Sequence, residues 1–272
     1  MESEKFRGKS TEELVSELME RGMALDIDLV NEIAARKDAA GCLRYWLQYR
    51  SERGWAAIHA IHLLGMIKTR ESFDALCYAL VNRQEALSDW LTEAMPGLLA
   101  GFGPEYLPDL ERVFAMESLD EAARGVATDA ISAIGWKHPE ARGKAVSFLK
   151  GVVEREGNPY LVADAICELG DLHEASAVPV MEKAFEDKRV DEDVIRRSEA
   201  VRQAKGELDW GTPGETLKRC EGYFTKENFE YLQGVNDESE EKQQGVAKNA
   251  LCPCGSGKRY KKCCMGKDSA SA

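Results

Sequence analysis

Small and apolar residues recur three and four positions apart along residues 10–233, the spacing that places side chains on one face of an α-helix. Four segments align with one another and begin at Ala56, Leu91, Val126 and Leu161. Each holds two apolar-periodic stretches. A glycine recurs between the two stretches after 36, 34 and 35 residues, at Gly65, Gly101, Gly135 and Gly170. The pattern predicts a repeating pair of helices.

Helix boundaries in these repeats have recognisable residues. We expect each repeat glycine to supply the left-handed residue that commonly ends a helix. Proline follows Gly103, His138 and Asn158, where it suits the first position of a helix. Ser10 and Glu13 have the spacing of a capping box. The sequence therefore predicts helical hairpins with defined ends.

Helical hairpins repeated at this period bury their apolar faces by stacking, which predicts an all-α fold of the α-solenoid type. An ordinary helical bundle with coincidental glycine spacing is the alternative. We assign residues 1–233 to the repeat domain, with caps at about 10–50 and 191–233. Residues 234–248 are polar and acidic and are predicted to be a flexible linker. A small module at 249–266 and a disordered tail at 267–272 complete the predicted organisation.

One repeat carries a family resemblance. The stretch LGDLHEASAVPVMEKAF, Leu169 to Phe185, resembles a HEAT-like repeat of the kind also found in phycobilisome lyases. The resemblance extends over about residues 54–187 and implies a HEAT-like α-solenoid. It implies little about activity, because one fold supports many functions.

Composition and charge narrow the class of protein. The chain is 44% hydrophobic and 31% charged, which is typical of a globular protein. Its net charge is −12, but the six cations and one aspartate from Gly245 onward give this end +5, which leaves −17 for residues 1–244. Phosphate binding depends on Lys and Arg, so any nucleic-acid contact is expected through the C-terminal tail alone.

The longest apolar stretch, 55–67, is too short to cross a membrane, and the first residues do not resemble a secretory signal. We therefore expect a cytoplasmic protein without membrane insertion. In that reducing compartment, clustered cysteines favour metal binding over disulfides. Cys42, Cys77 and Cys167 lie in apolar helical patterns and are expected to be buried, whereas the pattern around Cys220 gives it no role.

The remaining cysteines crowd together near the C-terminus. They follow the pattern Cys-x-Cys, eight residues, Cys-Cys, at Cys252, Cys254, Cys263 and Cys264. Four thiolates from two short arms suit one tetrahedral, structural Zn²⁺, with metal–sulfur distances of about 2.3 Å. A segment this short has little core, so the metal is expected to supply most of its folding free energy.

Between the two cysteine pairs lies a basic loop, whose residues are Lys258, Arg259, Tyr260, Lys261 and Lys262. Its cations offset the formal charge of −2 on a four-thiolate zinc site. They equally suit a docking surface for an acidic partner or for RNA phosphates, with Tyr260 as an aromatic contact. Both interpretations remain open at this point.

The stretch from Asn249 to Gly266 resembles the SEC-C module, the zinc-binding motif at the C-terminus of the preprotein-translocase motor SecA. The resemblance implies that Cys252, Cys254, Cys263 and Cys264 ligate zinc. It also implies contacts of the kind that SecA's module makes with the chaperone SecB and the ribosome, or a contact with SecA itself. The chain has no ATPase motif, so no motor function follows.

The rest of the chain gives weaker signals. His59 and His62 share one apolar helical stretch and are expected to be structural rather than metal ligands. The tryptophans are expected to pack in the core, although one or two on a concave face would suit a partner; they are Trp46, Trp55, Trp90, Trp136 and Trp210. Carboxylates are too numerous to pair from sequence. No nucleophile elbow or His-Glu-x-x-His motif occurs, so no enzyme is indicated.

These observations favour a non-enzymatic adaptor. Its solenoid is expected to bind a partner protein, while its zinc module docks on ribosome, translocation or chaperone components. Two alternatives belong to other classes. One is a HEAT-like lyase or isomerase, which only the repeat resemblance motivates, and the other is a nucleic-acid-binding zinc module.

Overall fold

A computed structural model describes residues 4–24, 26–50, 55–208 and 213–233, together with the single residues 259 and 262. The described residues form helices and turns without a β-strand, which confirms the all-α prediction. The chain divides into two units, Met1–Phe224 and Thr225–Ala272. The described part of the second unit is chiefly one helix at 226–233.

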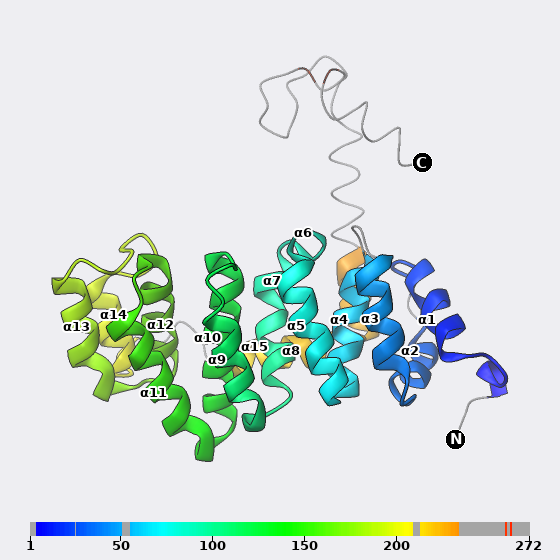
Figure 1. The fold of residues 1–272 in the computed structure, drawn as a ribbon, viewed down its shortest axis with the longest axis horizontal. Coiled ribbons are helices and arrows are strands. Elements are labelled where there is room, and N and C mark those ends of the chain that lie inside the picture. The colour runs from blue at the N-terminus through cyan, green and yellow to red at the C-terminus, as the bar shows by residue number, and fades with distance from the viewer. Residues whose placement is uncertain are drawn as a thin grey trace. The chain divides into compact units, whose positions relative to one another are not determined.

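The first unit contains all the labelled helices (Figure 1). Its N-terminal half comprises η1 (Glu4–Phe6), α1 (Thr11–Glu20), α2 (Ile27–Ala34), α3 (Ala39–Tyr49), α4 (Trp55–Ile67), α5 (Arg70–Asn82), α6 (Gln84–Leu87), α7 (Trp90–Glu93) and α8 (Met95–Ala100). Its C-terminal half comprises η2 (Pro104–Tyr106), α9 (Leu107–Phe114), α10 (Glu121–Lys137), α11 (Pro139–Arg155), α12 (Pro159–Asp171), η3 (Ala175–Ala177), α13 (Val178–Glu186), α14 (Arg197–Ala204) and α15 (Pro213–Glu221).

Several helices begin where the sequence predicts. The amide of Ser10 donates to Glu13 Oε2 at 2.7 Å, and the amide of Glu13 donates to Ser10 Oγ at 3.2 Å, which completes the capping box of α1. Asn158 Oδ1 accepts from the amide of Tyr160 at 2.9 Å and caps α12. Pro139 and Pro159 are the first residues of α11 and α12. Pro104 begins η2, directly before α9.

The helices of the first unit pack in order along the chain. One row contains α4, α8, α10 and α12, each of which contacts the next, and α14 follows α12. Helices α3 and α5, and likewise α11 and α13, contact each other alongside that row. Figure 1 shows this succession from α1 at one end of the unit to α13 at the other. The core runs through the whole unit, and α4 is buried from Ala57 to Gly65.

None of the repeat glycines is left-handed, and only Gly101 ends a helix, contrary to the sequence prediction. Gly65, Gly135 and Gly170 lie inside α4, α10 and α12, and Gly101 caps α8 with a φ of −59°. The left-handed residues that follow α4 and α12 are instead Lys68 and His173, with φ values of 53° and 51°.

Three of the repeat glycines serve close packing between helices. A Cβ atom on Gly135 would lie 2.7 Å from Cβ of Ala145 on α11, and one on Gly65 would lie 2.6 Å from Leu98 on α8. One on Gly170 would lie 2.8 Å from Gln203 of α14. These distances are too short for such contacts, so a side chain at any of the three positions would force neighbouring helices apart.

Helix α15 returns to the middle of the first unit. It packs against α8 and α10, while α14 packs against α12 and α13 at the end of the row. Gly214 of α15 lies so close to the Trp136 indole that a Cβ would meet it at 2.3 Å. The segment that we assigned to the C-terminal cap thus contains two helices with separate neighbours. The predicted linker, zinc module and tail remain predictions, and nearly all their residues lie outside the described ones.

Within the described residues, no helix has the length and apolar character needed to cross a membrane.

Candidate functional site

The predicted zinc site lies almost wholly outside the described residues. This holds for all four cysteines and for Lys258, Tyr260 and Lys261 of the basic loop. Arg259 and Lys262 are described and exposed, and the Lys262 amide donates to the Arg259 carbonyl at 2.8 Å. In the part of the chain that the structure describes, no three His, Cys, Asp or Glu side chains are placed to hold a metal ion.

A cluster of four carboxylates, which sequence reasoning missed, forms between α10 and α12. We call it the acidic cluster: Asp129, Asp164, Glu168 and Asp171. The three residues of α12 are spaced four and three apart and therefore share one helix face. Asp129 approaches them from α10, which packs directly against α12. All four residues are half-buried.

Only part of the acidic cluster is satisfied by hydrogen bonds. The Thr128 hydroxyl donates to Asp164 Oδ2, and the Gln203 side-chain amide of α14 donates to Asp171 Oδ1. Asp129 Oδ1 is buried and has no hydrogen-bond partner. Gln203 is only 2% exposed, and its Oε1 is likewise unpartnered. Asp129 Oδ1 of the cluster and the neighbouring Gln203 Oε1 are thus acceptor atoms that are shielded from water and still lack donors.

Burial and mutual repulsion make these carboxylates hard to ionise. Burial raises the pKa of Asp164 to about 7. Burial, reinforced by the charges of Asp171 and Asp164, raises the pKa of Glu168 to about 8. The pKa of Asp129 is raised by the same two causes. None of these three carboxylates forms an ion pair with a described residue, so no described cation relieves their repulsion.

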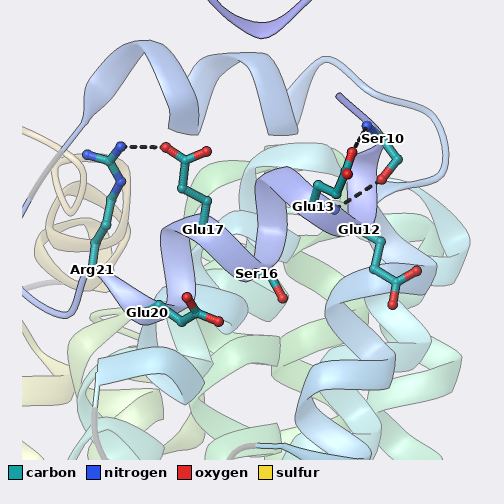
Figure 2. A pocket seen from close by; sticks show the side chains of 7 residues that line it. All are labelled: Ser10, Glu12, Glu13, Ser16, Glu17, Glu20 and Arg21. Atoms are coloured by element: carbon teal, nitrogen blue, oxygen red, sulfur yellow. Dashed lines mark hydrogen bonds and ion pairs between the residues drawn. The ribbon is translucent and has the colours of Figure 1, made fainter. Parts of the chain in front are cut away.

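A second acidic surface, on α1, has a different character. Figure 2 shows its side chains, which are Ser10, Glu12, Glu13, Ser16, Glu17, Glu20 and Arg21. Glu13 belongs to the capping box, and Glu17 pairs with Arg21 at 2.5 Å and with Lys9 at 2.7 Å. The hydrogen bond from the Ser10 amide lowers the pKa of Glu13, and that from Lys9 lowers the pKa of Glu17. These charges stabilise the helix itself, and the surface is open to solvent.

His59 and His62 lie on α4 in a group of aromatic rings. His59 Nδ1 lies 2.9 Å from the Tyr223 hydroxyl, and its Nε2 lies 2.7 Å from the Gly22 carbonyl oxygen. Trp90 and Phe224 meet His62 edge to face. Of the tryptophans, Trp136 is 42% exposed, while Trp46, Trp55 and Trp90 are half-buried and Trp210 lies outside the described residues.

The other cysteines are not clustered. Cys42, Cys77 and Cys167 are half-buried against the core, and burial raises the pKa of each thiol. Cys220 is half-buried, and its Sγ donates to the Ala94 carbonyl at 3.2 Å. This contact links α15 to the segment before α8.

Comparison with known families gives one result for the C-terminal region. The family model of the SEC-C motif matches residues 249–266. These are the residues that carry the sequence resemblance, so the SEC-C part of the prediction is confirmed. No curated protein matches the chain. The match covers the small module alone and gives no information about the role of the helical unit.

Proposed function

We propose that this protein is a non-enzymatic adaptor with two binding modules. The first unit is a HEAT-like stack that binds a cationic segment of a partner protein at the acidic cluster. The SEC-C module binds one structural Zn²⁺ and docks on ribosome, translocation or chaperone components. The SEC-C match at 249–266 is the observation that carries the proposal.

The zinc part rests on the motif and its donor set. Cys252, Cys254, Cys263 and Cys264 supply four thiolates, which close a tetrahedral shell and leave no position for a catalytic water. Such a site is structural, and its metal orders the short module. The exposed cations Arg259 and Lys262 are then available to a partner surface.

The partner of the helical unit is inferred from the acidic cluster. Asp164 and Glu168 ionise reluctantly because each carboxylate is shielded from water and faces others. A Lys or Arg side chain placed among them would lower their pKa values and would supply donors to Asp129 Oδ1 and Gln203 Oε1. The body also carries most of the negative charge of the chain, which favours a basic partner.

Two modules on one chain bind a common assembly more tightly than either does alone, because binding of the first raises the effective concentration of the second. This arrangement accounts for an acidic body and a basic tail in one protein. The proposal makes docking through the tail independent of the acidic cluster.

Sucrose-gradient sedimentation of lysate tests the docking part. Full-length protein and a chain that ends at Lys248 are compared, each with and without a zinc chelator. We expect the full-length protein to migrate with ribosomes and to lose this migration on truncation or chelation. If it instead migrates alone, purified SecA and SecB are tested for zinc-dependent capture. Failure of all three partners would reject docking through the module.

Decalysine tests the acidic cluster on the full-length protein. The double variant Asp164→Asn, Glu168→Gln removes two carboxylates of the cluster. The control double variant Glu12→Gln, Glu20→Gln removes two carboxylates from the exposed surface in Figure 2, and both are compared at pH 9, where Asp164 and Glu168 are largely ionised. We expect decalysine affinity to fall about fivefold or more in the first variant and much less in the control, because shielded charges are screened less than exposed ones. Equal losses would reject the cluster as a binding site.

A nucleic-acid-binding module is the second candidate, because Arg259 and Lys262 are exposed. It predicts that binding of the full-length protein to single-stranded RNA weakens steeply with salt. Docking that is insensitive to salt would favour the protein-binding function.

A further inference from the structure

The first unit contains a cavity that neither binding module uses. It has a volume of about 340 Å³ and is bounded by residues of α2, α4, α8 and α15, with Phe224 just beyond α15. Leu98, Leu217 and Phe224 give it an apolar wall. This volume lies at the lower end of the range of small-molecule sites, about 300–1,000 Å³.

His62 supplies a buried polar group to this cavity. The side chain is 3% exposed, and neither ring nitrogen has a hydrogen-bond partner. Burial lowers the pKa of His62 to about 3, so the ring is neutral near pH 7. A neutral imidazole carries one donor and one acceptor. Leaving both unpaired in the interior is costly, so the arrangement calls for a ligand that satisfies them.

His59 on the same helix shows how such a ring is normally accommodated. It is 1% exposed, and both of its nitrogens lie within hydrogen-bond distance of oxygen atoms, one from Tyr223 and one from Gly22. His62 stacks on Tyr223 with ring centroids 3.6 Å apart and planes 3° apart. The stack, with the edges of Trp90 and Phe224, holds the His62 ring in one orientation at the cavity wall. Both nitrogens of this fixed ring remain without a partner.

The rim of the cavity carries both charges. Lys68 and Glu221 are exposed there, and Glu221 lies 3.8 Å from Lys137. The exposed Asn31 also borders the cavity. The rest of the lining is apolar apart from His62 and the half-buried Cys220, whose Sγ donates to a backbone carbonyl. A ligand that enters fully is therefore expected to be uncharged and largely apolar.

We propose that this cavity binds a small neutral heteroaromatic molecule that has both a hydrogen-bond donor and an acceptor, and that His62 is its polar contact. This inference is independent of the zinc module and of the acidic cluster. Benzimidazole is a suitable probe, because it is a flat bicycle with one N–H donor and one nitrogen acceptor. Indene has a similar shape and no nitrogen.

The experiment observes the imidazole nitrogens of the full-length protein, labelled with ¹⁵N-histidine, by NMR at pH 8. The chain has four histidines, and His62→Phe assigns the His62 signals. We expect benzimidazole to shift the His62 signals in a saturable manner and to leave those of His138 and His173 unchanged. We expect indene to bind at least tenfold more weakly, because it leaves the imidazole unpaired.

Variants separate a site from an apolar void. His62→Phe keeps an aromatic ring in the stack and removes both nitrogens, so benzimidazole affinity should fall about tenfold or more. Gly97→Leu places a side chain in the cavity wall and should reduce binding of both probes, while the exposed Met116→Gln should not change it. Equal binding of benzimidazole and indene, or full binding by His62→Phe, would overturn the proposal. So would His62 signals that do not respond to benzimidazole.

Discussion

Tyr223 contacts both histidines of α4 at once: its ring lies parallel to that of His62, and its hydroxyl lies 2.9 Å from His59 Nδ1. The residues in this hydrogen bond are 164 positions apart. Tyr223 is 2% exposed, so the contact is part of the core. One side chain thus joins the segment after α15 to a helix near the start of the first unit.

Removal of this side chain should destabilise the first unit. We expect Tyr223→Ala to lower the free energy of unfolding by about 3–5 kcal/mol, as for other large buried aromatic side chains. Tyr223→Phe should cost about 1–3 kcal/mol, because it removes only the hydroxyl that His59 contacts. Urea denaturation measures both. The 69% exposed Tyr231 provides the control Tyr231→Ala, and equal effects at the two positions would contradict this role.

Two glycines of one helix pair should respond oppositely to alanine. Gly135→Ala should destabilise the protein by about 1–3 kcal/mol, because its Cβ would clash with Ala145. Gly143→Ala should stabilise it by about 0.5–1 kcal/mol, because no atom lies within 4 Å of the added Cβ and alanine favours the helix. Thermal unfolding measures the two shifts. A gain in stability for Gly135→Ala would rule out close packing as the reason for the repeat glycine.

The acidic cluster should make stability fall as pH rises. The pKa of Glu168 is about 8 in the folded protein, above its ordinary value, so the unfolded chain loses this proton first. Below about pH 4 this carboxyl is protonated in both states and does not affect stability. Between about pH 4 and pH 8 it ionises in the unfolded chain but not in the folded protein, so the free energy of unfolding falls as pH rises. We expect Glu168→Gln to raise the free energy of unfolding at pH 8 by about 1 kcal/mol or more, relative to its effect at pH 4. Urea titrations at both pH values measure the difference, and the exposed Glu20→Gln should show none.

The protonation of Asp164 and Glu168 should also change the affinity of the acidic cluster for a cationic peptide. Asp164 and Glu168 are largely protonated at pH 6 and largely ionised at pH 9. We therefore expect decalysine to bind more tightly at pH 9 than at pH 6. Binding near pH 7, where both groups are still partly protonated, should release protons from the cluster. Calorimetry in buffers of different ionisation enthalpy counts these protons. The variant Asp164→Asn, Glu168→Gln should lose the proton release, and an unchanged proton count would show that the peptide binds elsewhere.

Zinc content should depend on the clustered cysteines alone. We expect about one zinc ion per chain and its loss in Cys254→Ser and Cys263→Ser, because a structural site needs all four ligands. Cys42→Ser, which changes a half-buried thiol of the helical unit, should retain the metal. Elemental analysis after dialysis checks the three variants. Zinc retained by Cys254→Ser and Cys263→Ser would contradict the assigned ligand set.

Local features of this fold were predictable from the sequence. The capping box at Ser10 and the proline that begins α12 depend on residues a few positions apart, so the linear pattern contains the whole interaction. The all-helical class follows from the spacing of apolar residues, and the SEC-C motif from a compact cysteine pattern. Each is specified by neighbours in the chain.

Features that depend on distant segments were not predictable in this way. The repeat glycine resembles a helix end in the sequence, and only the approach of Ala145 to Gly135 reveals a packing role. The spacing of Asp164, Glu168 and Asp171 places three carboxylates on one helix face, but Asp129 and Gln203 join them from two other helices, which the sequence does not indicate. The cavity at His62 is likewise lined in part by α15, and no local sequence pattern predicts that α15 packs against α8.

The return of α15 to α8 and α10 also has a consequence for how the first unit unfolds. In an open array of repeats each pair of helices contacts only its neighbours, so a terminal pair can separate while the rest stays folded. Here α15 packs against α8 and α10, and loss of α15 would expose apolar surface on these two helices in the middle of the unit. The contact closes a long loop of chain, which slows folding and couples distant helices into one cooperative transition. Proteolysis that begins at the C-terminal side of this unit would therefore weaken its middle before its end.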